Sequence, residues 1–138
     1  MTSLPESIRS LILDEHARRP ELFAAVDLAA YLVKLADKAE ILSDSFAGRC
    51  RGVVAFYCND QATKQAFITL VLVDPRDRGM GIGRALVACV LDLAARRGFT
   101  SCRLEVAQRN ETARALYQSM GFRMVEVRAH THLLEIGL

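Results

Sequence analysis

The chain has 138 residues, 51% hydrophobic and 25% charged, which is the length and composition of one ordinary globular domain. Its formal net charge of +2 is too small to predict a nucleic-acid partner. No apolar run approaches the roughly 20 residues of a membrane span, and the N-terminus lacks the apolar segment of a signal peptide. We therefore expect one domain over residues 1–138, in the cytoplasm and away from membranes.

Four cysteines occur at a spacing that fits neither a zinc site nor a redox motif: Cys50, Cys58, Cys89 and Cys102. Cys89 falls on an apolar helix face, and Cys58 and Cys102 fall in strand-like runs. We expect buried, reduced thiols, which suit a cytosolic protein.

Two amphipathic helices are predicted near the N-terminus. The first begins with a capping box in which Ser3 is the N-cap, and Pro20 ends it. Its inner stripe consists of Ile8, Leu11 and Ile12. The second helix is predicted over 27–38 with Asp27 as its N-cap.

Six strands are predicted from apolar runs that lie between turn residues. Their ranges are 39–46, 52–58, 65–73, 101–106, 122–128 and 131–136. The third is apolar on both faces, as expected of a central strand. The first two and the last two form hairpins, which implies antiparallel pairing.

Two further helices follow the third and fourth strands. The longer one starts near Ile82 and ends before Gly98, which we predict as its C′ residue. The shorter one is capped by Asn110, ends at Gly121, and has Tyr117 on its inner side. A strand–helix–strand connection implies parallel pairing. The sequence thus predicts a mixed α/β fold, with a central mixed sheet and helices on both faces.

A glycine-rich turn joins the third strand to the longer helix. Its glycines alternate at Gly79, Gly81 and Gly83. Glycines allow close backbone approach, and a helix N-terminus favours negative charge, so the turn predicts a phosphate site. It lacks the Gly-Lys-Ser/Thr ending of a nucleotide P-loop and the spacing of a dinucleotide motif. A purely structural tight turn is the alternative.

Two motifs resemble those of the GNAT superfamily of N-acetyltransferases. Residues 73–75 and 78–83, Val-Asp-Pro and Arg-Gly-Met-Gly-Ile-Gly, resemble its acetyl-CoA motif, Arg/Gln-x-x-Gly-x-Gly/Ala. Residues 104–106, 110–117 and 121–122 resemble its second motif. The resemblance implies an acyl-CoA N-acyltransferase fold, a single N-acetyltransferase domain over 1–138, and acetyl-CoA as co-substrate.

The resemblance also implies which residues contact coenzyme A. Backbone N–H groups would hold the pyrophosphate at Arg78, Gly79, Met80, Gly81, Ile82, Gly83 and Arg84. Main-chain groups of Val71 and Val73 would pair with the pantetheine arm like an added strand, and an N–H near Leu72 would polarise the thioester carbonyl. Asn110 would contact the arm or the phosphate region, and this role is compatible with helix capping.

Tyr117 matches the position where the superfamily often has its general acid. A phenol with an ordinary pKa of about 10 can protonate a departing thiolate. Glu105 matches the catalytic glutamate of some ribosomal-protein N-acetyltransferases, and we take it as the candidate base. The alternatives are that Tyr117 only packs on the helix's inner face and that Glu105 forms a salt bridge with Arg103 or another arginine.

Other groups could replace Glu105 as the base. Many relatives use a carboxylate on the cofactor strand, where this chain has Thr69 and Leu70. A water relay through Thr69, or a base from Asp60 or His132, therefore stays open. His130 and His132 would share a face if both lay in the last strand, but two ligands do not make a metal site, and no metal is expected.

The expected activity is direct acetyl transfer to a primary amine of a small molecule or amino sugar. No covalent acyl-enzyme is expected because the motif region has no recognisable Cys–His pairing. A protein N-terminus as acceptor, a non-catalytic acyl-CoA-binding module and, more weakly, a nucleotide phosphate binder are the alternatives. Homodimerisation through the C-terminal hairpin is left open.

Overall fold

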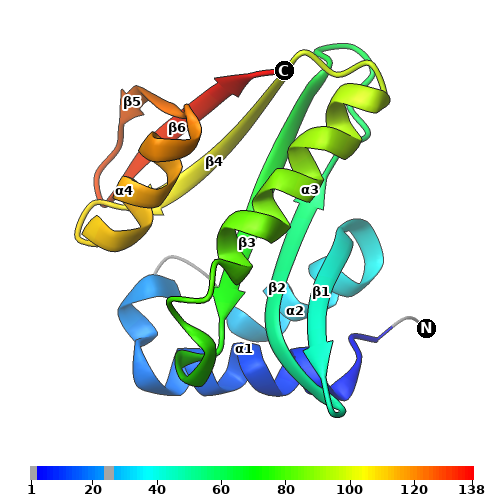
Figure 1. Ribbon diagram of the computed structural model, residues 1–138, viewed down its shortest axis with the longest axis vertical. Helices are drawn as coiled ribbons and strands as arrows, with labels where there is room; N and C mark the ends of the chain where they lie inside the picture. Colours follow the sequence, from blue (N-terminus) through cyan, green and yellow to red (C-terminus); the bar gives the residue numbers. More distant parts are fainter. Residues whose placement is uncertain (1–2, 24–26) are drawn as a thin grey trace. The chain divides into compact units, whose positions relative to one another are not determined.

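The computed structural model describes residues 3–23 and 27–138 (Figure 1). Its helices are α1 (Glu6–Arg18), η1 (Pro20–Phe23), α2 (Leu28–Lys38), η2 (Pro75–Asp77), α3 (Ile82–Arg96) and α4 (Glu111–Met120). Its strands are β1 (Glu40–Phe46), β2 (Arg49–Tyr57), β3 (Gln65–Val73), β4 (Ser101–Ala107), β5 (Arg123–Val127) and β6 (Thr131–Gly137). None of the described helices is long and apolar enough to cross a membrane.

The six strands form one mixed sheet in the order β1-β2-β3-β4-β6-β5. Strands β3 and β4 are parallel, whereas β6 is antiparallel to both β4 and β5. The predicted mixed sheet is thus confirmed. Strand β2 starts three residues earlier than predicted because Ala47 and Gly48, with φ of 53° and 76°, close a two-residue hairpin turn.

The chain divides into two compact units. Unit 1 contains residues 1–55 and 70–86, and unit 2 contains residues 56–69 and 87–138. Strands β2 and β3 and helix α3 each contribute residues to both units. The expectation of a single domain over residues 1–138 stays a prediction.

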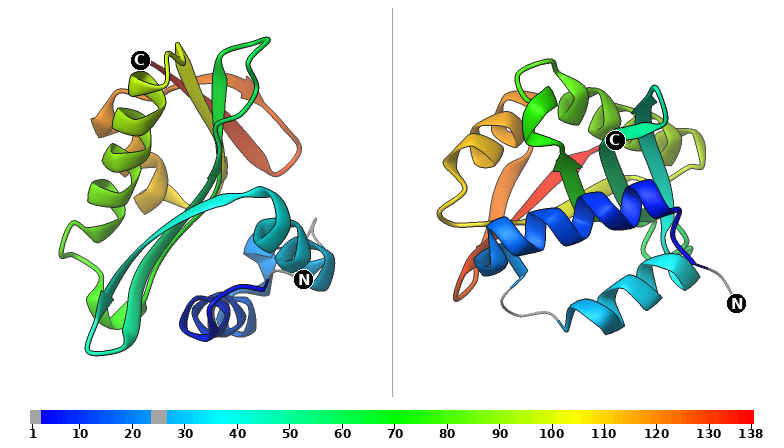
Figure 2. Two further views of the ribbon diagram at one scale, coloured as in Figure 1. Left: turned by 90° about the vertical axis from the view of Figure 1, so that its right-hand side faces the viewer. Right: turned by 90° about the horizontal axis from the view of Figure 1, so that it is seen from below.

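The core of unit 1 joins α1 and α2 to one face of β2 and β3. Its members include Ile8, Leu11, Ile12, Leu32, Leu35, Val53, Ala55, Leu70 and Leu72. On β2, Gly52 admits the first turn of α3, because a Cβ there would lie 2.6 Å from Ile82 Cγ2. Helices therefore cover both faces of the strands in unit 1, as predicted (Figure 2).

The predicted start of α1 is wrong. Pro5 occupies the N-cap position without a side-chain hydrogen bond, and its carbonyl accepts from the N–H groups of Ile8 and Arg9. Ser3 lies two residues before this cap, which is too early to reach the first turn as an N-cap does. The cap predicted for α2 is confirmed, since the Asp27 side chain accepts from the Ala30 N–H at 3.3 Å.

Both helices that end in unit 2 stop where the sequence predicts. Gly98 and Gly121 follow α3 and α4 with φ of 83° and 108°, a conformation that favours glycine. The predicted burial of Cys89 is wrong, because the thiol lies at the rim of the apolar stripe of α3 and is exposed. The other three cysteines are buried and reduced.

Candidate functional site

The glycine turn begins where β3 ends. The Asp74 side chain caps η2 by accepting from the Arg76 N–H at 2.9 Å. Gly79 and Gly81 then have φ of 82° and 78°, and a Cβ on either would meet no atom within 4 Å. Their backbone conformation, rather than lack of space, therefore requires glycine.

The turn presents backbone donors at the N-terminus of α3. The first helical hydrogen bond runs from the Ala85 N–H to the Gly81 carbonyl at 3.0 Å. The N–H groups of the first helical turn point out of the N-terminus of a helix, where an anion is favoured. Residues 78–81 are exposed. This combination suits a phosphate group.

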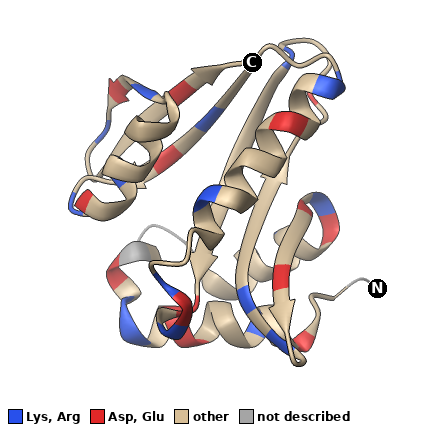
Figure 3. Cartoon of the chain, in the orientation of Figure 1, with Lys and Arg blue, Asp and Glu red and all other residues tan. Residues whose placement is uncertain are grey.

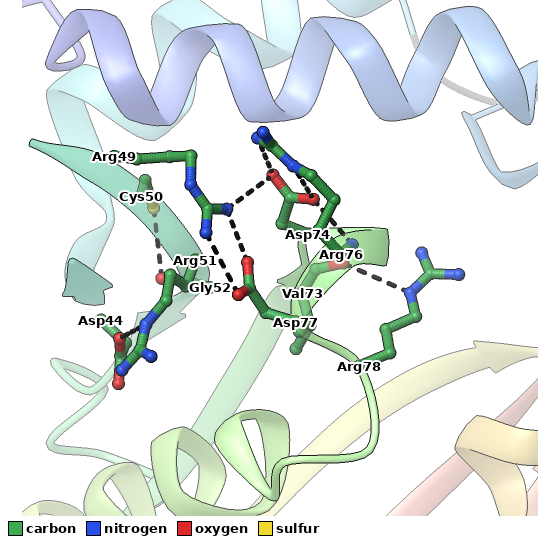
Figure 4. Close-up of polar contacts among 10 residues, drawn as sticks. All are labelled: Asp44, Arg49, Cys50, Arg51, Gly52, Val73, Asp74, Arg76, Asp77 and Arg78. Carbon is green, nitrogen blue, oxygen red and sulfur yellow. Dashed lines mark hydrogen bonds and ion pairs between the residues drawn. The ribbon is translucent and has the colours of Figure 1, made fainter. Parts of the chain in front are cut away.

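Arg49 of β2 holds the segment before the glycines (Figure 4). Its guanidinium donates two hydrogen bonds to Asp77, at 2.6 and 3.2 Å, and one to Asp74 at 3.3 Å. Both carboxylates are buried, with 7% of each residue exposed. The Asp74 N–H also donates to the Arg51 carbonyl at 2.7 Å, which ties the turn to β2 a second time.

These ion pairs shift the acidities of both carboxyl groups. Hydrogen bonding from Arg76 is the main cause that holds the pKa of Asp74 far below its usual range. Hydrogen bonding from Arg49 lowers the pKa of Asp77. Figure 3 shows both signs of charge together around η2. Sequence reasoning missed Arg49 because it lies 25 and 28 residues from its partners.

The Arg78 side chain is directed toward α1. It donates to Glu15 Oε2 at 3.1 Å and more weakly to the Val73 carbonyl at 3.4 Å. Glu15 is buried and also accepts from Arg18 at 2.9 Å. The predicted contribution of Arg78 to phosphate binding was through its backbone N–H, which these contacts do not use.

Strand β3 continues past its pairing with β4. The paired residues are Gln65–Ile68 opposite Ser101–Leu104. Val71, Leu72 and Val73 lie beyond the last pair, so in the described chain this part of the β3 edge is not paired with β4. The Leu72 side chain is in the unit 1 core, and the predicted contact of a nearby N–H with the thioester stays a prediction.

Tyr117 lies buried on α4 in unit 2. Its ring makes an edge-to-face contact with Phe122, with centroids 5.8 Å apart. Burial raises the pKa of the Tyr117 phenol to about 12, so it stays protonated at neutral pH. Tyr117 thus packs on the inner face of α4, and its role as the general acid stays a prediction.

Asn110 caps α4 as predicted. Its side-chain oxygen accepts from the Ala113 N–H at 3.2 Å. Its contact with the cofactor stays a prediction.

Glu105 is exposed on β4 and ion-paired with Arg128. Its other carboxylate oxygen accepts from the Thr131 hydroxyl at 3.0 Å. Arg103 pairs instead with Glu135 at 3.0 Å. The salt-bridge alternative thus holds with Arg128 as the partner, and the role of Glu105 as a base stays a prediction.

The alternative bases differ in how well they suit proton transfer. Asp60 accepts from the N–H groups of Ala62 and Thr63, and hydrogen bonding from Thr63 lowers its pKa, which makes it a weaker base. His132 is half-buried in β6. His130 precedes β6, so the two histidines do not share a strand face. Within residues 3–23 and 27–138, no group of three potential metal ligands occurs.

The predicted residues fall into two sets. Residues 71–73 and 78–84 come together in unit 1, on consecutive segments of the chain. Glu105, Asn110 and Tyr117 all belong to unit 2, on β4 and α4.

Comparison with known proteins identifies the family. Residues 6–122 match the model of the acetyltransferase (GNAT) family. The bS18-alanine N-acetyltransferase of Escherichia coli is 34% identical over 76 residues, 55% of this chain and 51% of that protein. The mycothiol acetyltransferase of Beutenbergia cavernae is 41% identical over 70 residues, 51% of this chain and 23% of that protein. This chain thus matches about half or less of each relative's length.

The fold agrees with these sequence matches. The crystal structure of an N-acetyltransferase from Thermoplasma acidophilum in complex with coenzyme A superposes with a TM-score of 0.69 at 17% identity, over 98% of this chain and 80% of that one. At this identity the likeness concerns the fold. The family match covers most of the chain, and the chain therefore belongs to the GNAT family of acetyltransferases.

Proposed function

We propose that this protein transfers an acetyl group from acetyl-CoA directly to a primary amine. The glycine turn carries the proposal, because it places exposed backbone donors at the N-terminus of α3 with positive φ at Gly79 and Gly81. The open space beside both glycines suits the approach of a pyrophosphate. Family membership supports coenzyme A as the compound that brings it.

The remaining contacts to coenzyme A would come from the predicted residues. Amides of 78–84 hold the pyrophosphate, and Val71 and Val73 pair with the pantetheine arm along the β3 edge. An N–H near Leu72 polarises the acyl carbonyl, and Asn110 contacts the arm or phosphates. Acetyl-CoA supplies a thioester, whose acyl carbon is the electrophile.

Proton transfers balance the reaction. The amine nitrogen forms a bond to the acyl carbon as the carbon–sulfur bond breaks. Glu105, directly or through water, takes the proton that the amine loses. Tyr117, which is protonated at neutral pH, donates its phenolic proton to the leaving sulfur.

For the acceptor we propose a small molecule or amino sugar that bears a primary amine. The chain has no long basic or acidic run of the kind that binds a charged polymer. The similarity to a mycothiol acetyltransferase supports a small acceptor. The similarity to a ribosomal-protein alanine N-acetyltransferase supports the second candidate, a protein N-terminus.

An acceptor panel tests this proposal. The purified protein is incubated with acetyl-CoA and with glucosamine, spermidine or a peptide that begins with alanine. Thiol release and the mass of the acetylated amine are measured. We expect turnover with a small amine and, for Tyr117→Phe, a kcat lower by about 100-fold. Tyr57→Phe, which changes another tyrosine whose pKa is raised by burial, is the control.

Three outcomes would contradict parts of the proposal. Turnover of the peptide alone would make a protein N-terminus the acceptor. An unchanged kcat for Tyr117→Phe would remove Tyr117 as the acid. An unchanged kcat for Glu105→Gln would remove Glu105 as the base, and Glu126→Gln is the matched control because Glu126 also pairs with Arg128, at 3.2 Å.

A second candidate function is a non-catalytic acyl-CoA-binding module. The ion pair of Glu105 with Arg128, together with Thr69 and Leu70 at the family's alternative carboxylate positions, favours it. Tight binding of acetyl-CoA without turnover of any amine in the panel would support this candidate over the enzyme.

A further inference from the structure

Strand β5 has an unusual degree of exposure. It is the last strand of the sheet, and all five of its residues are exposed. Three apolar side chains of β5 are exposed, with Met124 at 53%, Val125 at 41% and Val127 at 59% exposed. Edge strands with such apolar side chains are templates for pairing with another segment.

A groove runs alongside this strand. It has a volume of about 330 Å³, and its lining residues come from α4, β5, β6 and the α4–β5 connection, all in unit 2. Phe122, Met124 and Leu134 give it apolar walls. Its basic groups are Arg114, Arg123 and His132, and none of the residues that line it is acidic.

We propose that the groove and the edge of β5 bind an extended, acidic segment of a partner protein. The segment adds to β5 as a further strand, through main-chain hydrogen bonds. Because strand side chains alternate between faces, every second residue of the segment enters the groove. Acidic side chains there meet Arg114 and Arg123, and the residues between them lie on the opposite face of the added strand.

The charges of the chain disfavour a second copy as the occupant. Self-pairing through β5 would bring the segment 121–130 of one copy against the same segment of the other. This segment contains two arginines, Arg123 and Arg128, and one acidic residue, Glu126. It would therefore bring net positive charge to a groove that is already basic, and like charges across strands are destabilising.

A peptide of defined sequence tests the proposal. The probe is a short fluorescein-labelled peptide in which glutamate alternates with leucine, and binding to the full chain is followed by fluorescence anisotropy at low salt. We expect saturable binding that Arg123→Glu weakens by about tenfold or more, since loss of one charged contact in a groove is of order 1.4 kcal/mol. Arg114→Glu should act in the same direction.

Controls separate this mode of binding from charge attraction alone. Arg96→Glu changes an exposed arginine of α3 outside the groove and should leave the affinity unchanged. A peptide with lysine in place of glutamate should not bind. A peptide N-methylated at alternate residues keeps its charge but loses main-chain donors, and it should bind at least tenfold more weakly.

Several results would overturn the proposal. They are equal binding of the lysine peptide, equal binding of the N-methylated peptide, and an equal loss of affinity for Arg96→Glu and Arg123→Glu. A stable dimer in sedimentation that Val125→Arg dissociates would also overturn it, because β5 would then be occupied by a second copy. Circular dichroism of each variant verifies that the chain is folded.

Discussion

Arg49 couples the β1–β2 hairpin to the segment that presents the glycine turn. It is the partner of two buried carboxylates, those of Asp74, which caps η2, and of Asp77, the last residue of η2. Truncating the guanidinium would remove a hydrogen-bond donor from each of two buried carboxylates, so η2 and the glycines after it would shift. We therefore expect the loss of the guanidinium to weaken acetyl-CoA binding indirectly, through the shifted glycine turn and not through a contact between Arg49 and the cofactor.

For Arg49→Ala we expect the KM for acetyl-CoA to rise by about tenfold, with a smaller change in kcat, because displaced amides bind the pyrophosphate less well. Arg49→Lys should recover part of the loss. Arg51→Ala is the control, since Arg51 pairs with Asp44 at 2.7 Å in the same hairpin. Equal KM values for Arg49→Ala and the parent protein in steady-state kinetics would refute this coupling.

The same two carboxylates make stability dependent on pH. Their pKa values are lowered in the folded state from an unfolded value of 3.8. Below pH 3.8 the unfolded chain therefore binds more protons than the folded chain. The contribution of these carboxylates to the free energy of unfolding is fully present above about pH 4, and it is lost as the pH falls through their folded pKa values. We expect thermal melts of Asp77→Asn to lose less stability between pH 5 and pH 3 than those of the parent. Parallel curves would contradict this.

At the scale of elements, the glycine turn and the β1–β2 turn offer a matched pair of glycines. Gly81 and Gly48 have φ of 78° and 76°, and a Cβ on either meets no atom within 4 Å. Alanine at either position should cost about 1–2 kcal/mol of stability from backbone strain. Only Gly81 belongs to the segment that is predicted to bind the pyrophosphate of coenzyme A.

We therefore expect Gly81→Ala, but not Gly48→Ala, to raise the Kd for coenzyme A measured by calorimetry. The predicted increase is about tenfold or more, because the strained turn would relax and misplace its amides. Equal Kd values for the two variants would show that strain alone, and not the position of the turn, accounts for the effect.

The N-terminus of α4 has two roles that substitution can separate. Asn110→Ala removes the cap on the Ala113 N–H and should cost about 1 kcal/mol, whereas Asn110→Ser retains a good capping residue. If Asn110 also contacts coenzyme A, the serine variant should keep its melting temperature and show a higher KM. A serine variant with parental KM would leave capping as the role of Asn110.

At the scale of the whole molecule, local patterns predicted the elements well. Strand β3 has the predicted bounds because an apolar run ends at an Asp-Pro step, and α2 and α4 begin after their predicted caps. The predicted cap at Ser3 was wrong because Pro5, which lies closer to the helix, occupies the N-cap position. The predicted burial of Cys89 was wrong because this residue lies at the rim of the apolar stripe of α3. Neither error alters the topology.

Long-range contacts were beyond sequence reasoning. The ion pair of Arg49 with Asp77 and that of Arg78 with Glu15 join residues far apart in the chain. The sequence left open whether Glu105 acts as a base or forms a salt bridge. Its arginine partner, Arg128, comes from the β5–β6 hairpin, whose position relative to β4 the sequence does not give. The glycine turn was predictable because its sequence, conformation and position between β3 and α3 are all local.

The central claim is that the acetyl group passes directly from coenzyme A to an amine. Acetyl-CoA labelled in its acetyl group is mixed with excess protein, first without and then with the best acceptor of the panel, and the label is followed by mass spectrometry after rapid denaturation. We expect no label on the protein at any time, and label on the amine in step with thiol release. Label on a protein side chain that chases to the amine, or thiol release without acetylated amine, would contradict it.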